Sequence, residues 1–370
     1  MDMDSLELRS LVTGDGTLRI SLEPQELGEP GPGELLVRVE AAPINPSDLG
    51  LLLGPADVST LQLDGDVLTA KVPQERLGAV AARLGQSLPV GNEGAGTVIA
   101  AGPDQQQLIG RVVGMIGGAM YAQHRRIAAR DCIVLPEGAT PAEGASLFVN
   151  PLTALGFVET MKAEGHKAIV HTAAASNLGQ MLVRICLADG VPLVNIVRSA
   201  EQEKLLRDLG AEHVVDSSQA DFIQKLEAAI DATGATIAFD AIGGGKLGSQ
   251  IMSAMERVAS RKMGSYSRYG SDSFKQLYIY GALDLGPTIL NRLSFGFSWS
   301  VGGWLLTPFL QKAGMETNVR LRERVAREFR TTFASHYTDT ISLRDALRPE
   351  VVRAYEQKRT GSKYLIDPSR

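Results

Sequence analysis

The chain has 370 residues, of which 44% are hydrophobic and 21% are charged, and its formal net charge is −5. At roughly 150 residues per domain, this length predicts about two domains, and the composition excludes a disordered chain. The negative charge argues against a nucleic-acid-binding surface, which would be basic. With only two cysteines, Cys132 and Cys186, a disulfide framework and a cysteine-rich zinc site are excluded.

The N-terminal segment MDMDSLELRS is acidic and lacks the basic and apolar regions of a signal peptide. The longest candidate for a membrane span, residues 293–310, is interrupted by serines, glycines and Pro308. We therefore expect a soluble, cytoplasmic protein with a small-molecule substrate and with no nucleic-acid or membrane partner.

Residues 1–150 predict a β-rich domain. Short segments with alternating hydrophobicity, separated by glycines, are typical of the strands of a small barrel. These segments are 33–40, 94–101, 110–115, 120–127 and 131–135. Residues 54–90 are long for a barrel connection and contain a helical pattern over 73–84, so we interpret them as an insertion.

From about Pro151 onward, the pattern predicts strands that alternate with helices and hence a parallel sheet. Strands are expected over 168–172, 192–197, 213–216 and 236–240, and helices over 152–163, 177–188, 200–209 and 220–230. The polar segment 261–277 is a second predicted insertion. A strand over 362–366 should return the chain to the first domain. The predicted fold class is α/β, with one domain from 1–150 and 308–370 and another from 151–307.

The strand over 168–172 runs into a small-residue turn and then a helix, where a dinucleotide-binding fold places G-x-G-x-x-G. Only the third glycine of that motif is present. The helix N-terminus and the side chains of Ser176 and Asn177 could bind phosphate oxygens. Strand-to-helix turns are often rich in Ala and Ser, so this motif alone leaves nucleotide binding open. The predicted cofactor-binding residues of the turn are Ala174, Ser176, Asn177, Leu178 and Gly179.

The following strand ends at Val197 and leads to Arg198 and Ser199, where an NAD-binding fold would carry an acidic residue for the ribose. An arginine can instead pair with a 2′-phosphate, which favours NADPH over NADH. The alternative is that Arg198 is simply a solvated residue, because Glu201 and Glu203 lie nearby in the sequence.

Short motifs along nearly the whole chain carry a resemblance to a known family. The chain resembles the medium-chain dehydrogenase/reductase superfamily, and within it the zinc-free branch of quinone oxidoreductases and enoyl reductases. The matching stretches, in the family's order, are 45–48 (NPSD), 91–96 (GNEGAG), 136–138 (PEG), 150–154 (NPLTA), 209–216 (LGAEHVVD), 239–244 (FDAIGG), 280–282 (YGA) and 360–363 (TGSK).

This resemblance implies a GroES-like catalytic domain, a Rossmann NADP-binding domain, an active site in the cleft between them, and a homodimer. Zinc-dependent relatives carry a cysteine just before the Asp of the first motif and a histidine inside the second. Here Pro46 or Ser47 and Asn92 stand at those positions, and the four-cysteine structural lobe is absent. The histidines match no ligand spacing, so we expect no metal. They are His124, His166, His171, His213 and His336.

The resemblance also assigns roles to individual residues. It implies that Asn45 and Trp304 lie at the substrate cleft, although core packing is an equal alternative for Trp304. The remaining implied contacts are all with the cofactor. Asn150 and Thr153 would lie at the nicotinamide end, Tyr280 and Gly281 near the adenosine or its phosphate, Gly303 beside the nicotinamide, and Lys363 near a phosphate.

Without zinc to hold an alkoxide, the expected reaction is hydride transfer from NADPH to a quinone or an α,β-unsaturated carbonyl or thioester. Mitochondrial-type enoyl-thioester reductases carry a tyrosine proton donor shortly after the first motif, but residues 49–56 contain none. Tyr121 is more typical of a structural residue, so we name no catalytic acid, and water could deliver the proton. The other candidates are Tyr266, Tyr269, Tyr278 and Tyr280.

Two other functions remain open: a catalytically weak nucleotide-binding protein with a structural or regulatory role, and a zinc-type alcohol dehydrogenase. We further expect the insertion over 54–90 to narrow the substrate entrance. The apolar stretch 289–310 could supply an edge strand and a hydrophobic dimer interface.

Overall fold

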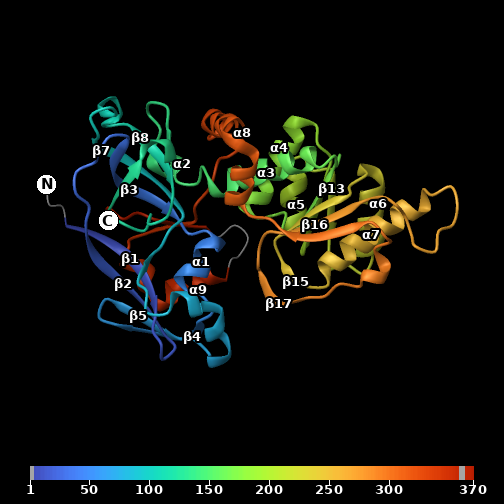
Figure 1. Ribbon diagram of the computed structural model, residues 1–370, viewed down its shortest axis with the longest axis horizontal. Helices are drawn as coiled ribbons and strands as arrows, with labels where there is room; N and C mark the ends of the chain where they lie inside the picture. The colour runs from blue at the N-terminus through green and yellow to red at the C-terminus, as the bar shows by residue number, and fades with distance from the viewer. Residues whose placement is uncertain (1–3, 358–362) are drawn as a thin grey trace. The chain divides into compact units, whose positions relative to one another are not determined.

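The computed structural model describes residues 4–357 and 363–370. Contacts divide the chain into two compact units, which are coloured along the sequence in Figure 1. The β-rich unit comprises Met1–Val149 with Arg322–Arg370, and the parallel-sheet unit comprises Asn150–Leu321. The α/β fold class is confirmed. Of the C-terminal motif, Thr360, Gly361 and Ser362 lie outside the described residues.

The described part of the β-rich unit contains two sheets with mostly antiparallel pairing. One has the order β4-β5-β2-β1-β6, from β1 (Asp4–Val12), β2 (Thr17–Glu26), β4 (Asp57–Asp64), β5 (Val67–Lys71) and β6 (Leu88–Pro89). The other has the order β10-β8-β7-β3-β20-β19, with β9 also paired to β3. Its strands are β3 (Glu34–Pro43), β7 (Glu93–Ala101), β8 (Val112–Ile116), β9 (His124–Ala128), β10 (Cys132–Val134), β19 (Asp339–Ile341) and β20 (Tyr364–Ile366).

Buried aliphatic side chains fill the space between the two sheets, because alternate residues of each strand face inward. Leu8 and Val12 of β1 and Val37 and Val39 of β3 are fully buried in one core. Helices α1 (Pro46–Leu52) and α9 (Pro349–Glu356) contribute to this core, and α2 (Pro141–Gly144) contacts β7. The strand at the C-terminus pairs with β3, which confirms that the chain returns to the first unit.

The parallel-sheet unit has the strand order β13-β12-β11-β14-β16-β18 in its described residues. Numbered along the chain, this is the Rossmann order 3-2-1-4-5-6, in which a crevice forms where the order reverses between β11 and β14. The strands are β11 (Ile169–His171), β12 (Leu193–Val197), β13 (His213–Asp216), β14 (Ile237–Asp240), β16 (Lys275–Ile279) and β18 (Trp299–Gly303). A small separate pair joins β15 (Gly243–Gly245) to β17 (Asp284–Thr288).

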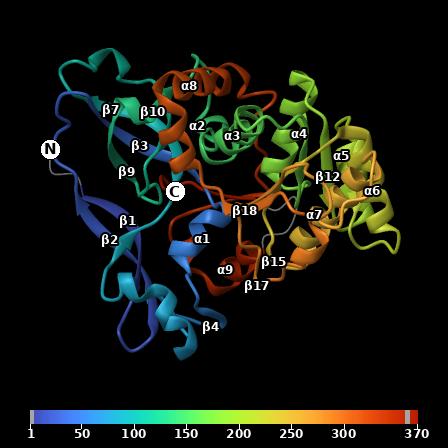
Figure 2. The ribbon, with the colours of Figure 1, turned by 45° about the vertical axis from the view of Figure 1, so that its right-hand side comes forward.

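Helices cover both faces of the parallel sheet, as Figures 1 and 2 show for α4 and α7. Helices α6 and α7 pack on the face that carries Val170, Val194 and Leu277, since these residues share one core. The helices of this unit are α3 (Val149–Ala163), which begins at the unit boundary, α4 (Asn177–Asp189), α5 (Ala200–Asp208), α6 (Phe222–Thr233) and α7 (Leu247–Arg261). In α8 (Leu306–Glu328), Gly314 has a non-helical φ of 82°.

The structure differs from the sequence-based expectation in two segments. Residues 54–90 form strands β4 and β5, which extend a sheet, and their helical pattern forms the 3-10 helix η1 (Gln74–Arg83). The polar segment 261–277 ends inside the parallel sheet, because Lys275 begins β16. The side chain of Lys275 is fully buried in an ion pair with Glu256. A charged residue at this position is therefore compatible with a buried strand and does not indicate a surface loop.

The second domain boundary also lies elsewhere than expected. The units divide after Leu321, whereas the sequence pattern suggested a division after residue 307. The boundary after Leu321 falls inside α8, beyond the break at Gly314, so no loop marks it in the sequence. Strands β1 and β2 lie outside the segments predicted as strands from the sequence.

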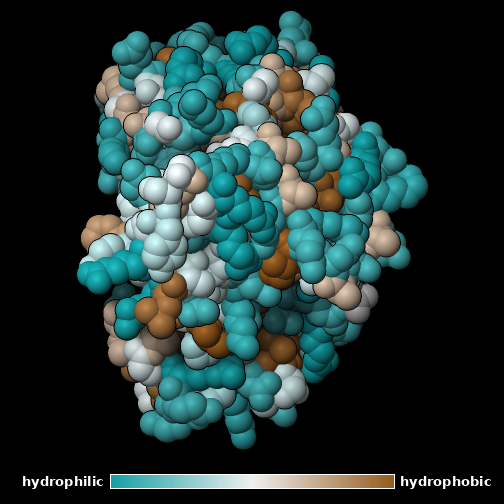
Figure 3. All heavy atoms as spheres, turned by 90° about the vertical axis from the view of Figure 1, so that its right-hand side faces the viewer, coloured by the Kyte–Doolittle hydropathy of each residue, from teal (hydrophilic) through white to brown (hydrophobic). Residues whose placement is uncertain are grey.

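Within the residues that the structure describes, no helix combines the length and the hydrophobicity needed to cross a bilayer. On the face shown in Figure 3, hydrophobic side chains form small groups among hydrophilic ones.

Candidate functional site

The turn that follows β11 leads directly into the N-terminus of α4. Ala173 adopts a positive φ of 49°, which is uncommon for a residue with a side chain. Ser176 caps α4, and its Oγ accepts a hydrogen bond from Gly179 N at 3.1 Å. A Cβ on Gly179 would lie 2.1 Å from the carbonyl oxygen of Ala174. Glycine is therefore required at position 179 so that α4 can pack closely against the turn.

The other residues of this turn differ in how far their side chains are buried. Ala174 and Leu178 are buried, whereas Ser176 and Asn177 are half-buried at the helix N-terminus. The first backbone N–H groups of a helix lack partners within the helix, and the helix dipole favours negative charge at that end. The turn can therefore hold an anionic group against the start of α4.

A buried polar contact spans the crevice between β11 and β14. Thr172 Oγ1 donates to Asp240 Oδ1 at 2.7 Å, and the backbone N–H of Ala241 donates to Thr172 Oγ1 at 2.8 Å. Asp240 also accepts hydrogen bonds from the backbone of Ile242 and Gly243. Both oxygens of the carboxylate are thus used in fixing the two strand ends.

Arg198 is exposed at the carboxyl end of β12, and its backbone N–H donates to Gln202 Oε1 at 3.0 Å. The acidic residues beside it in the sequence have other partners. Glu203 pairs with Arg207 at 2.8 Å. Hydrogen bonds from its own backbone N–H and from the Ser199 hydroxyl lower the pKa of Glu201. Ser199 also caps α5 by accepting from Gln202 N. The guanidinium of Arg198 can therefore meet a ligand anion.

Tyr280 and Trp304 belong to an aromatic cluster in the parallel-sheet unit. Tyr280 Oη lies 2.8 Å from His171 Nε2, and both rings pack against Phe157. Trp304 is only 7% exposed, and its Nε1 donates to Thr160 Oγ1 at 3.0 Å. Burial raises the pKa of Tyr280 and lowers the pKa of His171 to about 3. These contacts support the core-packing alternative for Trp304.

The remaining expected cofactor residues of this unit lie on α3 and at strand ends. Asn150 is half-buried and Thr153 is buried, both in the first part of α3. A Cβ on Gly281 would lie 2.6 Å from the carbonyl oxygen of Ala241, whereas one on Gly303 would meet nothing within 4 Å. The carboxyl ends of parallel strands share one edge of a sheet, so the segments after β11, β12, β16 and β18 meet there.

Asn45 lies in the β-rich unit, within a buried polar cluster. Its Nδ2 donates to Glu93 Oε1 at 2.8 Å, and its Oδ1 is buried without a hydrogen-bond partner. Glu93 Oε2 accepts two further hydrogen bonds, from the backbone N–H groups of Phe148 and Val149, each at 2.9 Å. Burial raises the pKa of Glu93 despite these donors.

Asp48 extends this cluster toward the second motif. Its two oxygens accept hydrogen bonds from the backbone of Asn45 at 2.8 Å and of Asn92 at 2.9 Å. Burial raises the pKa of Asp48 to about 7. The side chains of Ser47 and Asn92 touch each other at 3.1 Å, so two positions compared above with zinc ligands are neighbours in space.

Lys363 is also part of the β-rich unit. Its Nζ donates to Ser146 Oγ at 2.7 Å and lies 5.5 Å from the centre of the Tyr337 ring. The Tyr337 hydroxyl contacts the same serine oxygen at 2.9 Å. Burial lowers the pKa of Lys363 to about 8, while the charges of Glu93 and Asp48 act in the opposite direction.

Sequence reasoning named Asn45 and Lys363 but missed Glu93, Ser146 and Tyr337. An acidic residue between glycines in the second motif was the available signal for Glu93. Of the tyrosines considered as acids, Tyr121 is buried with its hydroxyl donating to Pro43 O, and Tyr278 donates to Glu164. Tyr266 and Tyr269 are 92% and 59% exposed.

Comparison with known proteins gives one family match. Residues 178–299 match the family model of zinc-binding dehydrogenases. This range lies entirely within the parallel-sheet unit, so it includes neither Ser47 nor Asn92.

Two curated relatives match part of the chain. The mitochondrial enoyl-[acyl-carrier-protein] reductase of Xenopus tropicalis is 30% identical over 228 residues, which are 58% of this chain and 58% of that protein. A mycocerosic acid synthase-like polyketide synthase of Mycobacterium tuberculosis is 29% identical over 267 residues, 70% of this chain and 11% of that protein. The chain thus spans less than two thirds of either relative.

A solved structure shows a likeness over the full length of the chain. It is a provisionally assigned NADPH:quinone reductase of Mesorhizobium loti, which is 26% identical, covers 100% of both chains and has a TM-score of 0.73. The Rossmann strand order and the motifs of both units agree with this likeness. The partial family match and these likenesses support the resemblance of this chain to the medium-chain dehydrogenase/reductase superfamily, in its quinone reductase-like and enoyl reductase-like branch.

Proposed function

We propose that this chain is an NADPH-dependent oxidoreductase that reduces a quinone or an α,β-unsaturated carbonyl or thioester without a metal ion. The main support for this proposal is the turn over 173–179. This turn lies where the strand order of the parallel sheet reverses, between β11 and β14. The strained backbone of Ala173 and the close packing of Gly179 shape this turn around the start of α4. The names of the relatives reported above support the reaction class.

The proposed nucleotide contacts come from three segments. The N-terminus of α4, with Ser176 and Asn177, would hold the pyrophosphate. Arg198 would pair with the 2′-phosphate, because the acids near it in the sequence are engaged elsewhere. Asn150, Thr153 and Gly303 would border the nicotinamide half, and Gly281 would lie near the adenosine or its phosphate. Bound NADPH would supply the hydride.

In the β-rich unit, Asn45 is the residue proposed to meet the substrate. Glu93 accepts a hydrogen bond from Asn45 Nδ2 and so fixes the orientation of the amide. Metal independence is supported by the amide and the hydroxyl of Asn92 and Ser47, which are poor ligands for zinc compared with cysteine and histidine. We assign no proton donor among the tyrosines.

We also propose a homodimer that pairs through β18. This strand lies at one end of the described six-stranded order and pairs only with β16 there. Leu293 and Phe297, just before it, are 83% and 78% exposed. An unpaired edge beside exposed apolar side chains favours association with a second copy. Light scattering at several protein concentrations should give twice the 39.5 kDa chain mass.

The test of the function is a titration of the purified protein with NADPH and with NADH, followed by an assay of NADPH oxidation with quinone and enone acceptors. Binding of NADPH in preference to NADH, with turnover of an acceptor and no bound zinc by elemental analysis, would support the proposal. NADPH binding without turnover of any acceptor would instead favour a structural or regulatory nucleotide-binding protein. Failure to bind either nucleotide would contradict both functions.

A further inference from the structure

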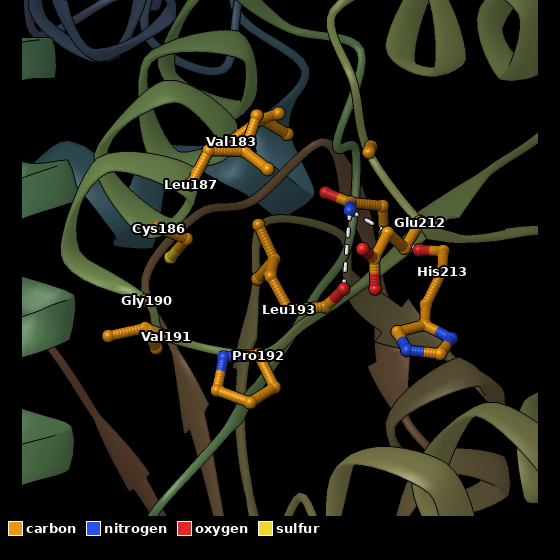
Figure 4. Close-up of a pocket in the computed structure, with 11 residues that line it drawn as sticks. Val183, Cys186, Leu187, Gly190, Val191, Pro192, Leu193, Glu212 and His213 are labelled. Atoms are coloured by element: carbon orange, nitrogen blue, oxygen red, sulfur yellow. Dashed lines mark hydrogen bonds between the residues drawn. The ribbon is translucent and has the colours of Figure 1, made fainter.

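Among the described residues, a surface hollow and a cation without an ion-pair partner lie outside the contacts proposed above. The hollow, of about 280 Å³, lies between the second half of α4 and the beginnings of β12 and β13. Figure 4 shows mainly aliphatic side chains around it, such as Val183 and Leu193, so its wall has little that would select a ligand. The cation is Lys363 of the β-rich unit, and its surroundings are more specific.

The strand pairing at the C-terminus brings Lys363 next to Asn45. The backbone N–H of Ile44 donates to Tyr364 O at 3.0 Å, in continuation of the antiparallel pairing of β3 with β20. The same register places Lys363 opposite Asn45. Because cross-strand partners project to the same face, the ammonium of Lys363 and the amide proposed to meet the substrate share one side of the β-rich unit.

Lys363 is half-buried and has few partners. Its Nζ donates to Ser146 Oγ at 2.7 Å, and the Tyr337 hydroxyl donates to the same oxygen at 2.9 Å. In the part of the chain that the structure describes, Ser146 is the one hydrogen-bond acceptor of this ammonium, and no carboxylate forms an ion pair with it. An ammonium has three N–H donors, so two are left for a ligand.

Two buried carboxyl groups favour the charged form of this lysine, although burial opposes it. Burial lowers the pKa of Lys363 to about 8, and the charges of Glu93, on β7, and Asp48, on α1, act in the opposite direction. The ring of Tyr337 faces Nζ at 5.5 Å. At neutral pH the ammonium is therefore mostly protonated, yet it gives up a proton more readily than an exposed lysine does. Such a group is suited to general acid catalysis.

We propose that Lys363 is the proton donor of the reaction and that Ser146 is a positioning residue that fixes the direction of its Nζ. The proposal rests on the reductase function proposed above, in which bound NADPH supplies the hydride. As the hydride bonds to the β-carbon of an enone, negative charge develops on the carbonyl oxygen. An N–H bond of Lys363 then breaks, and its proton bonds to that oxygen.

The products of this step are an enol and a neutral amine. The enol tautomerises in water to the saturated carbonyl compound, and the amine regains its proton from solvent. With a quinone as acceptor, the proton bonds to the oxygen that carries the negative charge and gives the hydroquinone. The same lysine thus serves both acceptor classes, because each develops its charge on a carbonyl oxygen.

The variants Lys363→Arg and Lys363→Ala test the proton transfer. Arginine keeps the positive charge but does not release a proton near neutral pH. With the quinone or enone that the wild type turns over, both variants should lower kcat about 100-fold or more and leave the dissociation constant of NADPH unchanged. Added ethylammonium, which replaces the deleted group, should restore part of the kcat of Lys363→Ala but none of that of Lys363→Arg.

Lys71→Ala is the matched control, because Lys71 is an exposed lysine of the same unit. This variant should keep the kcat of the wild type and should gain nothing from ethylammonium. Melting temperatures of all variants, measured without nucleotide, show that each one folds.

The pH dependence separates proton transfer from a structural role. Only the protonated lysine donates, so the kcat of the wild type should fall as the pH rises through about 8, and this fall should be absent in Lys363→Arg. In Ser146→Ala the ammonium loses its acceptor, so the fall should move to lower pH. In the chain without nucleotide, the carbon NMR signal of Lys363 Cε should titrate below those of the exposed lysines.

Four outcomes would count against the proposal. Wild-type kcat in Lys363→Arg, or an NMR titration of Lys363 like that of an exposed lysine, would overturn it. Weaker NADPH binding in Lys363→Ala, restored together with kcat in Lys363→Arg, would assign Lys363 to a cofactor phosphate, as the resemblance implies, and would overturn it as well. Absence of turnover in the wild type would instead contradict the proposed function, and the role of Lys363 would fall with it.

Discussion

The amide nitrogen of Asn45 donates a hydrogen bond to Oε1 of Glu93 across 2.8 Å, and both side chains are buried. The second oxygen of Glu93 accepts from two backbone N–H groups at the end of the first segment of the β-rich unit. One carboxylate therefore orients the Asn45 amide and also holds the backbone at residues 148 and 149.

Replacing Glu93 with Gln should lower the free energy of unfolding by about 1–3 kcal/mol, because the amide cannot accept on both sides and leaves a buried donor unpaired. Urea unfolding monitored by circular dichroism measures this change. Glu137→Gln is the matched control, since Glu137 is exposed. If the two variants are equally stable, the hydrogen bonds of Glu93 do not contribute as described.

Arg198→Ala should weaken NADPH binding by about tenfold or more while leaving NADH binding unchanged, because only NADPH carries the 2′-phosphate. Fluorescence titration with both nucleotides measures the two dissociation constants. Lys204→Ala removes a positive charge from the adjacent helix α5, where Lys204 pairs with Asp208, and should affect neither constant. Equal weakening of both nucleotides by Arg198→Ala would place this residue elsewhere than at the 2′-phosphate.

Gly179→Ala should destabilise the protein by about 1–3 kcal/mol, although alanine favours helices more than glycine does. The added methyl group would lie 2.1 Å from the carbonyl oxygen of Ala174, so α4 must move away from the turn. Nucleotide affinity should fall in parallel. In Gly264→Ala the new Cβ meets nothing within 4 Å, and this control should unfold as the wild type does. Wild-type stability in Gly179→Ala would show that the turn tolerates a wider spacing.

The stability of the β-rich unit should depend on pH through Asp48. Burial raises the pKa of Asp48 from its ordinary value of 3.8 to about 7. Between these pH values the folded chain keeps a proton that the unfolded chain has lost. The free energy of unfolding should therefore fall as the pH rises through this window, by up to about 1.4 kcal/mol per pH unit.

Asp48→Asn isolates this contribution, because the difference in unfolding free energy between wild type and variant should shrink from pH 4 to pH 7. The groups that face Asp48 are Glu93, Tyr121 and Lys363. The pKa of Glu93 is also raised, so Glu93 changes the free energy of unfolding with pH in the same direction as Asp48 does. Burial lowers the pKa of Lys363 from 10.5 to about 8, so its contribution should make stability rise between those values. A difference that does not vary with pH would mean that Asp48 ionises normally in the folded state.

The regular part of the fold could be predicted from the sequence because its periodicity is strong. The buried strands over 169–171 and 193–197 and the helix over 177–189 alternate as βαβ units require. The strands within residues 54–90 could not be predicted from local sequence, because β5 pairs with β2, about fifty residues earlier, and long-range pairing leaves little local signal. Likewise, the charge of Lys275 suggested a loop, whereas the partner that allows its burial, Glu256, lies on another element.

Site residues could be predicted from the sequence where a local motif defines them. They were harder to predict where the role of a residue depends on a contact with a residue far away in the chain. The backbone requirement at Gly179 follows from a local turn. The packing of Trp304 depends on Thr160, and the pairing of Tyr280 depends on His171. No spacing rule relates these residues. The same holds for Glu93, which connects Asn45 with the backbone of residues 148–149 across two segments of the chain.

The β-rich unit is interrupted by the whole parallel-sheet unit, and this has a consequence during synthesis on the ribosome. Strand β20 lies between β3 and β19 in its sheet, so that sheet lacks an inner strand until residue 366 has been made. The parallel-sheet unit is continuous and has all of its strands once residue 321 has emerged. The middle segment of the chain can thus complete its sheet first, while the sheet of β3 in the other unit keeps an unpaired strand edge until the C-terminal segment is made.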